Sequence, residues 1–228
     1  MTLRVGTLPL NAIRISLIVF VFALCALAAK QFTMPHPNPA RTYPAHDEHP
    51  TEHVTIAVDP YDTTAKEDPV FSVNYIEHGF YPMHFIVTND GSGVVSLINM
   101  KVELVTHNRT KIQPASNDDV FRRLTNLKRP GPRTLPIPIP STRARGGIPK
   151  EAYDELGQAQ FAAKAVEPHN TQSGFYFFDI SGISNPLAGA HLYVTGVKDD
   201  NGNELMYFEI PLEKYLSAPP APSSAPGK

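Results

Sequence analysis

Tryptophan is absent from the sequence, and cysteine occurs only once, at Cys25. A disulfide needs two cysteines and a thiolate metal site needs several, so neither forms within one chain. Cys25 lies in an apolar N-terminal segment, and if that segment is removed the rest of the chain has no thiol nucleophile. A folded domain must therefore be stabilised by its apolar core, and about 160 residues are enough to build one.

Charge is also scarce, with 18% charged residues and a net charge of −2. The chain as a whole has no electrostatic attraction to nucleic acid or acidic lipid, so any argument from charge must be local. Proline, by contrast, is abundant. Its 23 copies are roughly twice the average share, which favours loops, edge strands and extended segments over helix bundles.

Familiar catalytic motifs are missing from the sequence. It contains no Gly-x-Ser-x-Gly turn, no His-Glu-x-x-His helix and no phosphate-binding glycine loop. We therefore expect a protein that is not an enzyme and uses no cofactor.

The N-terminal residues have the pattern of an export signal. Arg4 and Arg14 precede an apolar run of 15 residues, Ile15–Ala29. That run is short for a membrane span of about 20 residues but fits the core of a signal peptide, and Ala26-Leu27-Ala28 offers a cleavage site. Residues 1–28 are thus expected to be a signal peptide or, if uncleaved, a membrane anchor. Both alternatives export the chain, into the periplasm or anchored in the inner membrane facing it.

Residues 29–53 have the composition of a proline- and histidine-rich linker. Five prolines between Gln31 and His53 argue against a continuous helix or strand and for an extended segment. Histidines lie beside acidic residues here, which suits zinc or copper, but their spacing matches no defined site. We expect a solvated linker whose weak candidate metal ligands are His46, His49 and His53.

The stretch from Phe80 to Thr106 contains the strongest fold signal. Two apolar runs, expected as strands over residues 81–89 and 94–106, flank Asn89-Asp90-Gly91-Ser92-Gly93. Asp-Gly between two such runs predicts a β-hairpin. Alternation in the second run predicts a buried face made of Ile98, Met100, Val102 and Leu104.

Further strands are expected on both sides of this hairpin. Residues 54–58 and 70–73 precede it, and Gly174–Asp179 is apolar on both faces, as in a central strand. Residues 192–197 and 204–210 flank Asn201-Gly202, which predicts a second hairpin. Seven short strands predict a mostly β fold: an antiparallel two-sheet immunoglobulin-like sandwich over residues 54–216, followed by a disordered Pro/Ala/Ser tail at 217–228.

A long, partly helical, Pro/Arg-rich insert interrupts this predicted domain at residues 114–166. Ser116 is expected to cap a short helix through Leu124, and a second helix is expected from Glu151 to Ala165.

Charge in the insert is one-sided, because eight basic residues and no acidic residue lie between Asp119 and Glu151. This basic run is either a surface loop without a dedicated partner or a docking segment for a protein or anionic envelope component. Nucleic acid is not expected, because the compartment is wrong and no aromatic residue lies between Leu124 and Lys150. The candidate partner-binding residues are Arg122, Arg123, Arg129, Arg133, Arg143 and Arg145.

Two segments resemble a known group of proteins. They read Phe85-Ile86-Val87-Thr88-Asn89-Asp90-Gly91 and Pro168-His169-Asn170-Thr171-Gln172-Ser173-Gly174-Phe175. A V-x-N-x-G strand end followed later by a P-x-x-x-x-x-G-F strand start resembles exported bacterial immunoglobulin-like β-sandwich domains of unknown function. The resemblance implies an exported sandwich but no activity, since fold alone does not determine function.

Together these observations predict a non-enzymatic binding or assembly module of the bacterial cell envelope that contacts its partner through the basic insert. The alternative is an exported protein that handles zinc or copper, or hydrolyses a substrate, with the histidines of the linker.

Overall fold

The computed structural model describes residues 32–125 and 150–218. Within these ranges the chain is mostly β, and the named strands pair antiparallel, as the sequence predicts. No helix in the described ranges is long and apolar enough to cross a membrane. The apolar run Ile15–Ala29 and most of the predicted tail lie outside the described residues.

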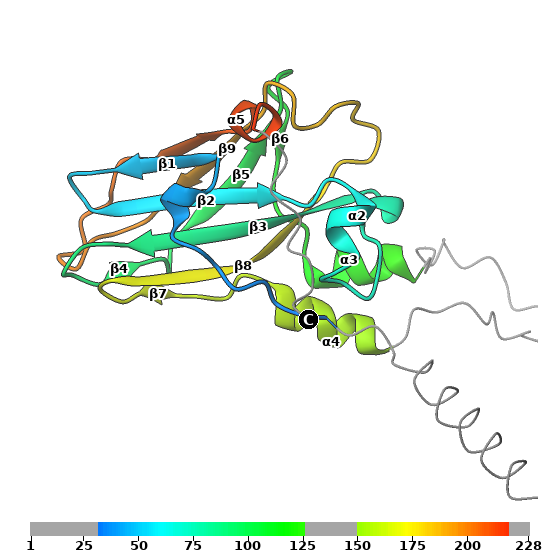
Figure 1. Ribbon diagram of the computed structural model, residues 1–228, viewed down its shortest axis with the longest axis horizontal. Helices are drawn as coiled ribbons and strands as arrows, with labels where there is room; N and C mark the ends of the chain where they lie inside the picture. Colours follow the sequence, from blue (N-terminus) through cyan, green and yellow to red (C-terminus); the bar gives the residue numbers. More distant parts are fainter. Residues whose placement is uncertain (1–31, 126–149, 219–228) are drawn as a thin grey trace, which may run out of the picture. The chain divides into compact units, whose positions relative to one another are not determined.

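The elements are arranged as Figure 1 shows. The strands are β1 His46–His49, β2 Val54–Pro60, β3 Phe80–Asn89, β4 Val95–Ser96, β5 Lys101–Val105, β6 Lys111–Ile112, β7 Ala165–Val166, β8 Asn170–Asp179, β9 His191–Thr195 and β10 Phe208–Pro211. The helices are η1 Ala40–Thr42, α2 Thr64–Glu67, η2 Ile76–His78, α3 Asn117–Leu124, α4 Lys150–Ala159 and α5 Glu213–Leu216.

Two four-stranded sheets, in the orders β1-β2-β3-β8 and β10-β9-β5-β6, share one hydrophobic core. Alternating residues of the strands in both sheets are buried in it, among them Ile56, Phe85, Leu104, Leu192 and Phe208. The short pair β4-β7 lies beside them. Because apolar faces of both sheets are removed from water together, this shared core is the main source of stability for the fold.

A second hydrophobic cluster covers the opposite face of β3 and β8. Phe175 and Phe177 of β8 pack there with Phe71 and Tyr75, while α3 and α4 contribute further buried side chains. Strand β8 therefore has apolar residues on both faces, as predicted. It is nevertheless the last strand of its sheet, where the sequence suggested a central strand.

The outer edge of β8 is not paired with a named strand. Backbone groups of Ala115 and Phe161 bond to it instead. The amide of Ala115 donates to the carbonyl oxygen of Phe177 (2.8 Å), and the amide of Phe161 donates to that of Phe175 (3.0 Å). These contacts satisfy β8 backbone groups that an uncovered edge would leave to solvent.

The prediction of a hairpin around Asp90-Gly91 is wrong. Strand β3 pairs with β2 and β8, and neither β4 nor β5 is its partner. The Asn89 side-chain amide donates to the carbonyl oxygens of Gly93 (2.7 Å) and Val166 (3.1 Å), and its oxygen accepts from the amide of Gly91 (2.9 Å). These bonds direct the chain out of the first sheet, so the turn residues make a crossing between sheets.

The second run of that stretch is broken into β4 and β5 by a turn, in which the Met100 amide donates to the Leu97 carbonyl (3.0 Å). Val102 and Leu104 are buried as predicted, but Ile98 is 72% exposed because it lies in the turn. The short strand predicted at residues 70–73 is a loop whose Phe71 fills the second cluster.

The predicted linker boundary is also wrong, because the part of residues 29–53 that the structure describes is packed onto the first sheet. Strand β1 pairs with β2, with His46 opposite Ala57 and His49 opposite Val54. Ala40 is buried, and its amide donates to the hydroxyl of Thr88 (2.8 Å). Prolines occur on both sides of β1 but not within it, so an edge strand is compatible with them.

Two local predictions are confirmed. Strands β9 and β10 pair as a hairpin, and the side chain of Asp199 holds their connection by accepting from the amide of Asn203 (2.7 Å). Ser116 caps α3, since its hydroxyl accepts from the amide of Asp119 (3.1 Å). Helix α4 ends at Ala159, earlier than predicted, because Phe161 pairs with β8.

Candidate functional site

Helices α3 and α4 form the base of the basic run. The rings of Phe121 and Tyr153 meet edge to face at 5.2 Å between centroids, and the Asn117 amide donates to Gln160 Oε1 (2.9 Å). Leu124 and Leu156 are buried in the same cluster. The basic run therefore leaves from one packed helix and returns through another.

Arg123 is engaged within the fold. Its guanidinium forms a two-point ion pair with Asp179 at the end of β8 and donates to the hydroxyl of Ser181 (2.6 Å). It also lies over the ring of Phe80, 4.5 Å from the centroid. These contacts tie α3 to the first sheet. The guanidinium of Arg123, a candidate partner-binding residue from the sequence, is therefore already engaged within the fold.

We predict that Arg123→Ala lowers the free energy of unfolding by about 1–2 kcal/mol, because a partly exposed ion pair and a cation–π contact are lost together. The ion pair holds the pKa of Asp179 at about 2, so it stabilises the fold above the ordinary pKa of 3.8 and is lost as pH falls through 2. In the variant, an NMR titration should find the pKa of Asp179 closer to 3.8. Arg122→Ala is the matched control, and equal losses in both variants would contradict the assignment.

Among the described residues, the side chain of Arg122 has only a local partner. It pairs with Asp119 one helical turn earlier at 3.0 Å, and 47% of its side chain is exposed. Such surface pairs contribute little, so its guanidinium remains accessible to other groups. The remaining candidates, Arg129, Arg133, Arg143 and Arg145, lie outside the described residues.

The three candidate metal ligands of the predicted linker have separate roles. His46 Nδ1 donates to the carbonyl oxygen of Tyr43 (2.6 Å), and the His49 ring stacks on Phe208 at 3.8 Å between centroids. His53 occupies a left-handed turn, with φ of 56°. Within residues 32–125 and 150–218, no group of three or more His, Cys, Asp or Glu side chains is placed to hold a metal ion.

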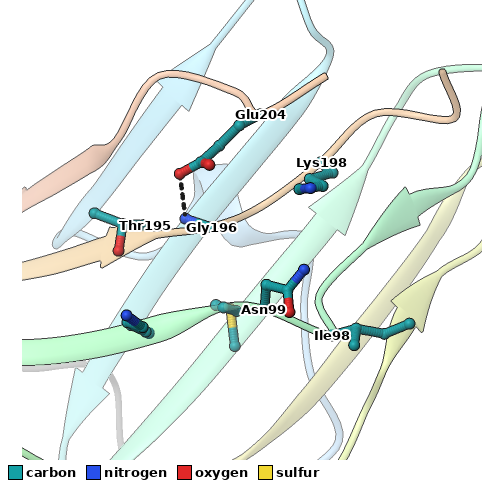
Figure 2. A pocket seen from close by; sticks show the side chains of 8 residues that line it. Ile98, Asn99, Thr195, Gly196, Lys198 and Glu204 are labelled. Carbon is teal, nitrogen blue, oxygen red and sulfur yellow. Dashed lines mark hydrogen bonds between the residues drawn. The ribbon is translucent and has the colours of Figure 1, made fainter. Parts of the chain in front are cut away.

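A polar depression of about 560 Å³ lies between the start of β5 and the end of β9. Figure 2 shows Glu204 reaching to Gly196, whose amide donates to Glu204 Oε1 at 3.1 Å. Its lining also includes Ile98, Asn99, Met100, Lys101, Thr195 and Lys198.

The chemistry of this depression suits a small anionic group. Neither Lys101 nor Lys198 forms an ion pair with any residue of the described ranges, whereas the single carboxylate, Glu204, accepts a backbone bond. Two ammonium groups beside one engaged carboxylate favour binding of a carboxylate or phosphate. Sequence reasoning missed this site, because its residues come from two connections that the chain brings together only on folding.

Two buried titratable groups serve the fold. Burial lowers the pKa of His84 to about 4, with a further contribution from Lys66, so its ring is neutral at pH 7 and stacks on Phe175. Glu155 accepts bonds from the amide and hydroxyl of Ser72 and from the hydroxyl of Tyr75, and so links α4 to the loop before η2.

Comparisons with known proteins assign no family. No family model and no curated protein matches the sequence. Among solved structures, a conserved hypothetical protein from Bacillus anthracis is similar over 67% of this chain and 85% of its own, with 13% identity and a TM-score of 0.27.

Proposed function

We propose that this chain is a non-enzymatic binding or assembly module of the bacterial cell envelope. Its partner is a protein or another anionic envelope component, and the contact is made by the basic residues between Asp119 and Glu151. The observation that carries the proposal is eight positive charges without one negative charge in a run that starts and ends on the packed pair α3 and α4.

Two of the eight basic residues form ion pairs within the described part of the fold. Within the described residues Arg123 is bound to Asp179 and Arg122 has a weak local partner, so we assign the contact to the other six basic residues of the run. Clustered arginines form charge-assisted bonds to carboxylates and phosphates, and loops on a rigid frame commonly carry binding function.

The frame and the location are parts of the same proposal. Two antiparallel sheets around a shared core support an immunoglobulin-like sandwich as the frame. The charged leader and apolar run Ile15–Ala29 support export, to the periplasm or as an inner-membrane anchor.

The rival proposal, a metal-handling or hydrolytic protein, needs the linker histidines to converge. His46 donates to a backbone carbonyl and His49 stacks on Phe208, so both rings already have contacts within the fold. We therefore favour the binding module.

A pull-down from envelope extract tests the proposal, with the full chain as bait. Replacing Arg129, Arg133, Arg143 and Arg145 by serine should reduce the recovered partner by about tenfold or more, because charge-assisted contacts are lost. Raising the salt to about 0.5 M should reduce recovery by the unaltered chain as well, because exposed charges are screened.

A matched control removes the same number of charges elsewhere. Arg41, Lys111, Lys164 and Lys214 are exposed residues outside the basic run, and their replacement by serine should leave recovery unchanged. A third variant, Lys101→Ser with Lys198→Ser, shows whether the polar depression takes part. A partner lost equally in the control variant, or no salt-sensitive partner at all, would refute the proposal.

A further inference from the structure

The outward face of the second sheet carries aromatic and charged residues at its centre. On β9, Leu192 and Val194 are buried while His191 and Tyr193 point away from the core. The strand register places Tyr193 between Glu103 of β5 and Glu209 of β10. This face is therefore polar and accessible, which is typical of a solvated sheet face or a binding surface.

At the edge of this face, strand β10 meets β1 of the other sheet. The amide of Glu209 donates to Asp47 Oδ2 at 2.8 Å, so a β1 side chain caps a backbone donor on the open edge of β10. A cleft of about 350 Å³ lies at this junction and is lined by Asp47, His49, His191, Met206, Tyr207 and Glu209, among others. The β1–β10 cleft is thus built by both sheets.

Among the residues that the structure describes, the lining of the cleft includes two carboxylates and no lysine or arginine. Asp47 accepts from a backbone amide, and Glu209 accepts from the hydroxyl of Tyr193 at 2.6 Å. Two histidines lie beside these carboxylates: His49 is 3.7 Å from Asp47, and His191 is 3.8 Å from Glu209. With histidine counted as neutral, the lining carries a charge of −2, which a cationic group would offset.

Aromatic and apolar side chains surround these carboxylates. Tyr207 is 48% exposed and Met206 is 71% exposed, and the ring of Tyr207 lies 6.1 Å from that of Tyr193. Tyrosine and methionine are enriched in protein interfaces, and tyrosine faces attract cations. The methylene stem of a long cationic side chain would pack on Met206 and Tyr207 while its head meets the carboxylates.

We propose that the β1–β10 cleft binds an arginine or lysine side chain presented by a basic protein segment. Planar carboxylates beside tyrosine rings complement a guanidinium in both charge and shape. A neutral glycan would leave both charges without a counter-charge, and an anionic ligand would be repelled. This site lies on strands rather than in the basic run, so it does not depend on the function proposed above.

Calorimetric titration of the full chain with an oligo-arginine peptide tests the proposal. The unaltered chain should bind the peptide, and Asp47→Asn with Glu209→Gln should weaken binding by about tenfold or more, because both charges are lost while acceptor oxygens remain. Tyr207→Ala should weaken it by a smaller factor. The control Glu48→Gln with Glu167→Gln removes two charges from exposed residues outside the lining and should bind as the unaltered chain does.

Two further titrations separate the alternatives. An oligo-glutamate peptide should not bind at this cleft, and an N-acetylglucosamine oligomer should not compete with the arginine peptide. Thermal unfolding of each variant shows that the fold is retained. The proposal is overturned if the arginine peptide does not bind, if the carboxylate variant binds it as well as the control does, or if the glycan displaces it.

Discussion

Replacing Gly196 by alanine is expected to destabilise the fold by about 2–5 kcal/mol, a large share of the stability of an ordinary domain. Gly196 has φ of 78°, where a side chain is unfavourable, and it is buried against the turn before β5. An added Cβ would lie 2.8 Å from the carbonyl carbon of Asn99 and closer still to its oxygen. Because these are backbone atoms, the end of β9 and the start of β5 would have to separate.

Gly182→Ala provides a matched control for this prediction. Gly182 also has φ of 78°, but no atom of the described part of the chain lies within 4 Å of the position a Cβ would take. Its replacement should therefore lower the free energy of unfolding only by the cost of an alanine at positive φ, about 1–2 kcal/mol. Denaturant unfolding of both variants measures the difference. If they lose the same stability, the close approach of Asn99 to Gly196 is not a constraint on the fold.

Local signals in the sequence were sufficient where a single element or a tight turn decides the outcome. The cap at Ser116 depends on one hydroxyl and an amide three residues later. The turn between β9 and β10 depends on the side chain of Asp199, which accepts from the amide of Asn203 four residues later. The buried face at Val102 and Leu104 follows from alternation alone. Each of these features is encoded within a few consecutive residues.

Pairing between distant segments was not predictable in the same way. Asp-Gly after β3 fits a hairpin locally, but the side-chain amide of Asn89 donates to Val166, 77 positions away. The chain continues into β4, which pairs with β7 and not with β3. Strand β1 was missed because its flanking prolines and polar residues look like a linker, although its backbone pairs with β2. Both outcomes depend on which partner strand is available after folding.

The candidate sites also differ in whether neighbouring or distant residues form them. The basic run is visible in the sequence because its charges are consecutive, yet the pairing of Arg123 with Asp179, 56 residues later, is not. The β1–β10 cleft combines a residue of the supposed linker, Asp47, with Glu209 near the end of the chain. Only His49, one of the three weak metal candidates, lines this cleft.

Glu67→Gln is expected to stabilise the protein above neutral pH and to remove much of its pH dependence. Glu67 at the end of α2 is 1% exposed, and its Oε1 accepts no hydrogen bond from the described residues. Burial raises the pKa of Glu67 from 4.5 to about 7. The buried carboxyl is therefore held protonated in the fold over a range in which the unfolded chain ionises.

The direction of the effect follows from the raised pKa. The stabilising contribution of protonated Glu67 is complete below pH 4.5 and declines as pH rises to about 7, above which the carboxylate is buried without full compensation. A difference of 2.5 between the two pKa values, 7 minus 4.5, corresponds to about 3 kcal/mol. Glutamine resembles the protonated acid, so the variant should be more stable than the unaltered chain by about this amount at pH 8 and nearly equal at pH 4.

Denaturant unfolding between pH 4 and pH 8 measures this difference directly. Glu167→Gln is the control, because Glu167 is an exposed acid that is not among the groups acting on the pKa of Glu67, and its replacement should leave the pH dependence as it is. Glu67→Gln with an unchanged pH dependence would show that Glu67 is ionised at little cost in the fold. A stability gain at pH 8 that disappears at pH 4 would instead identify Glu67 as the residue whose burial opposes folding at neutral pH.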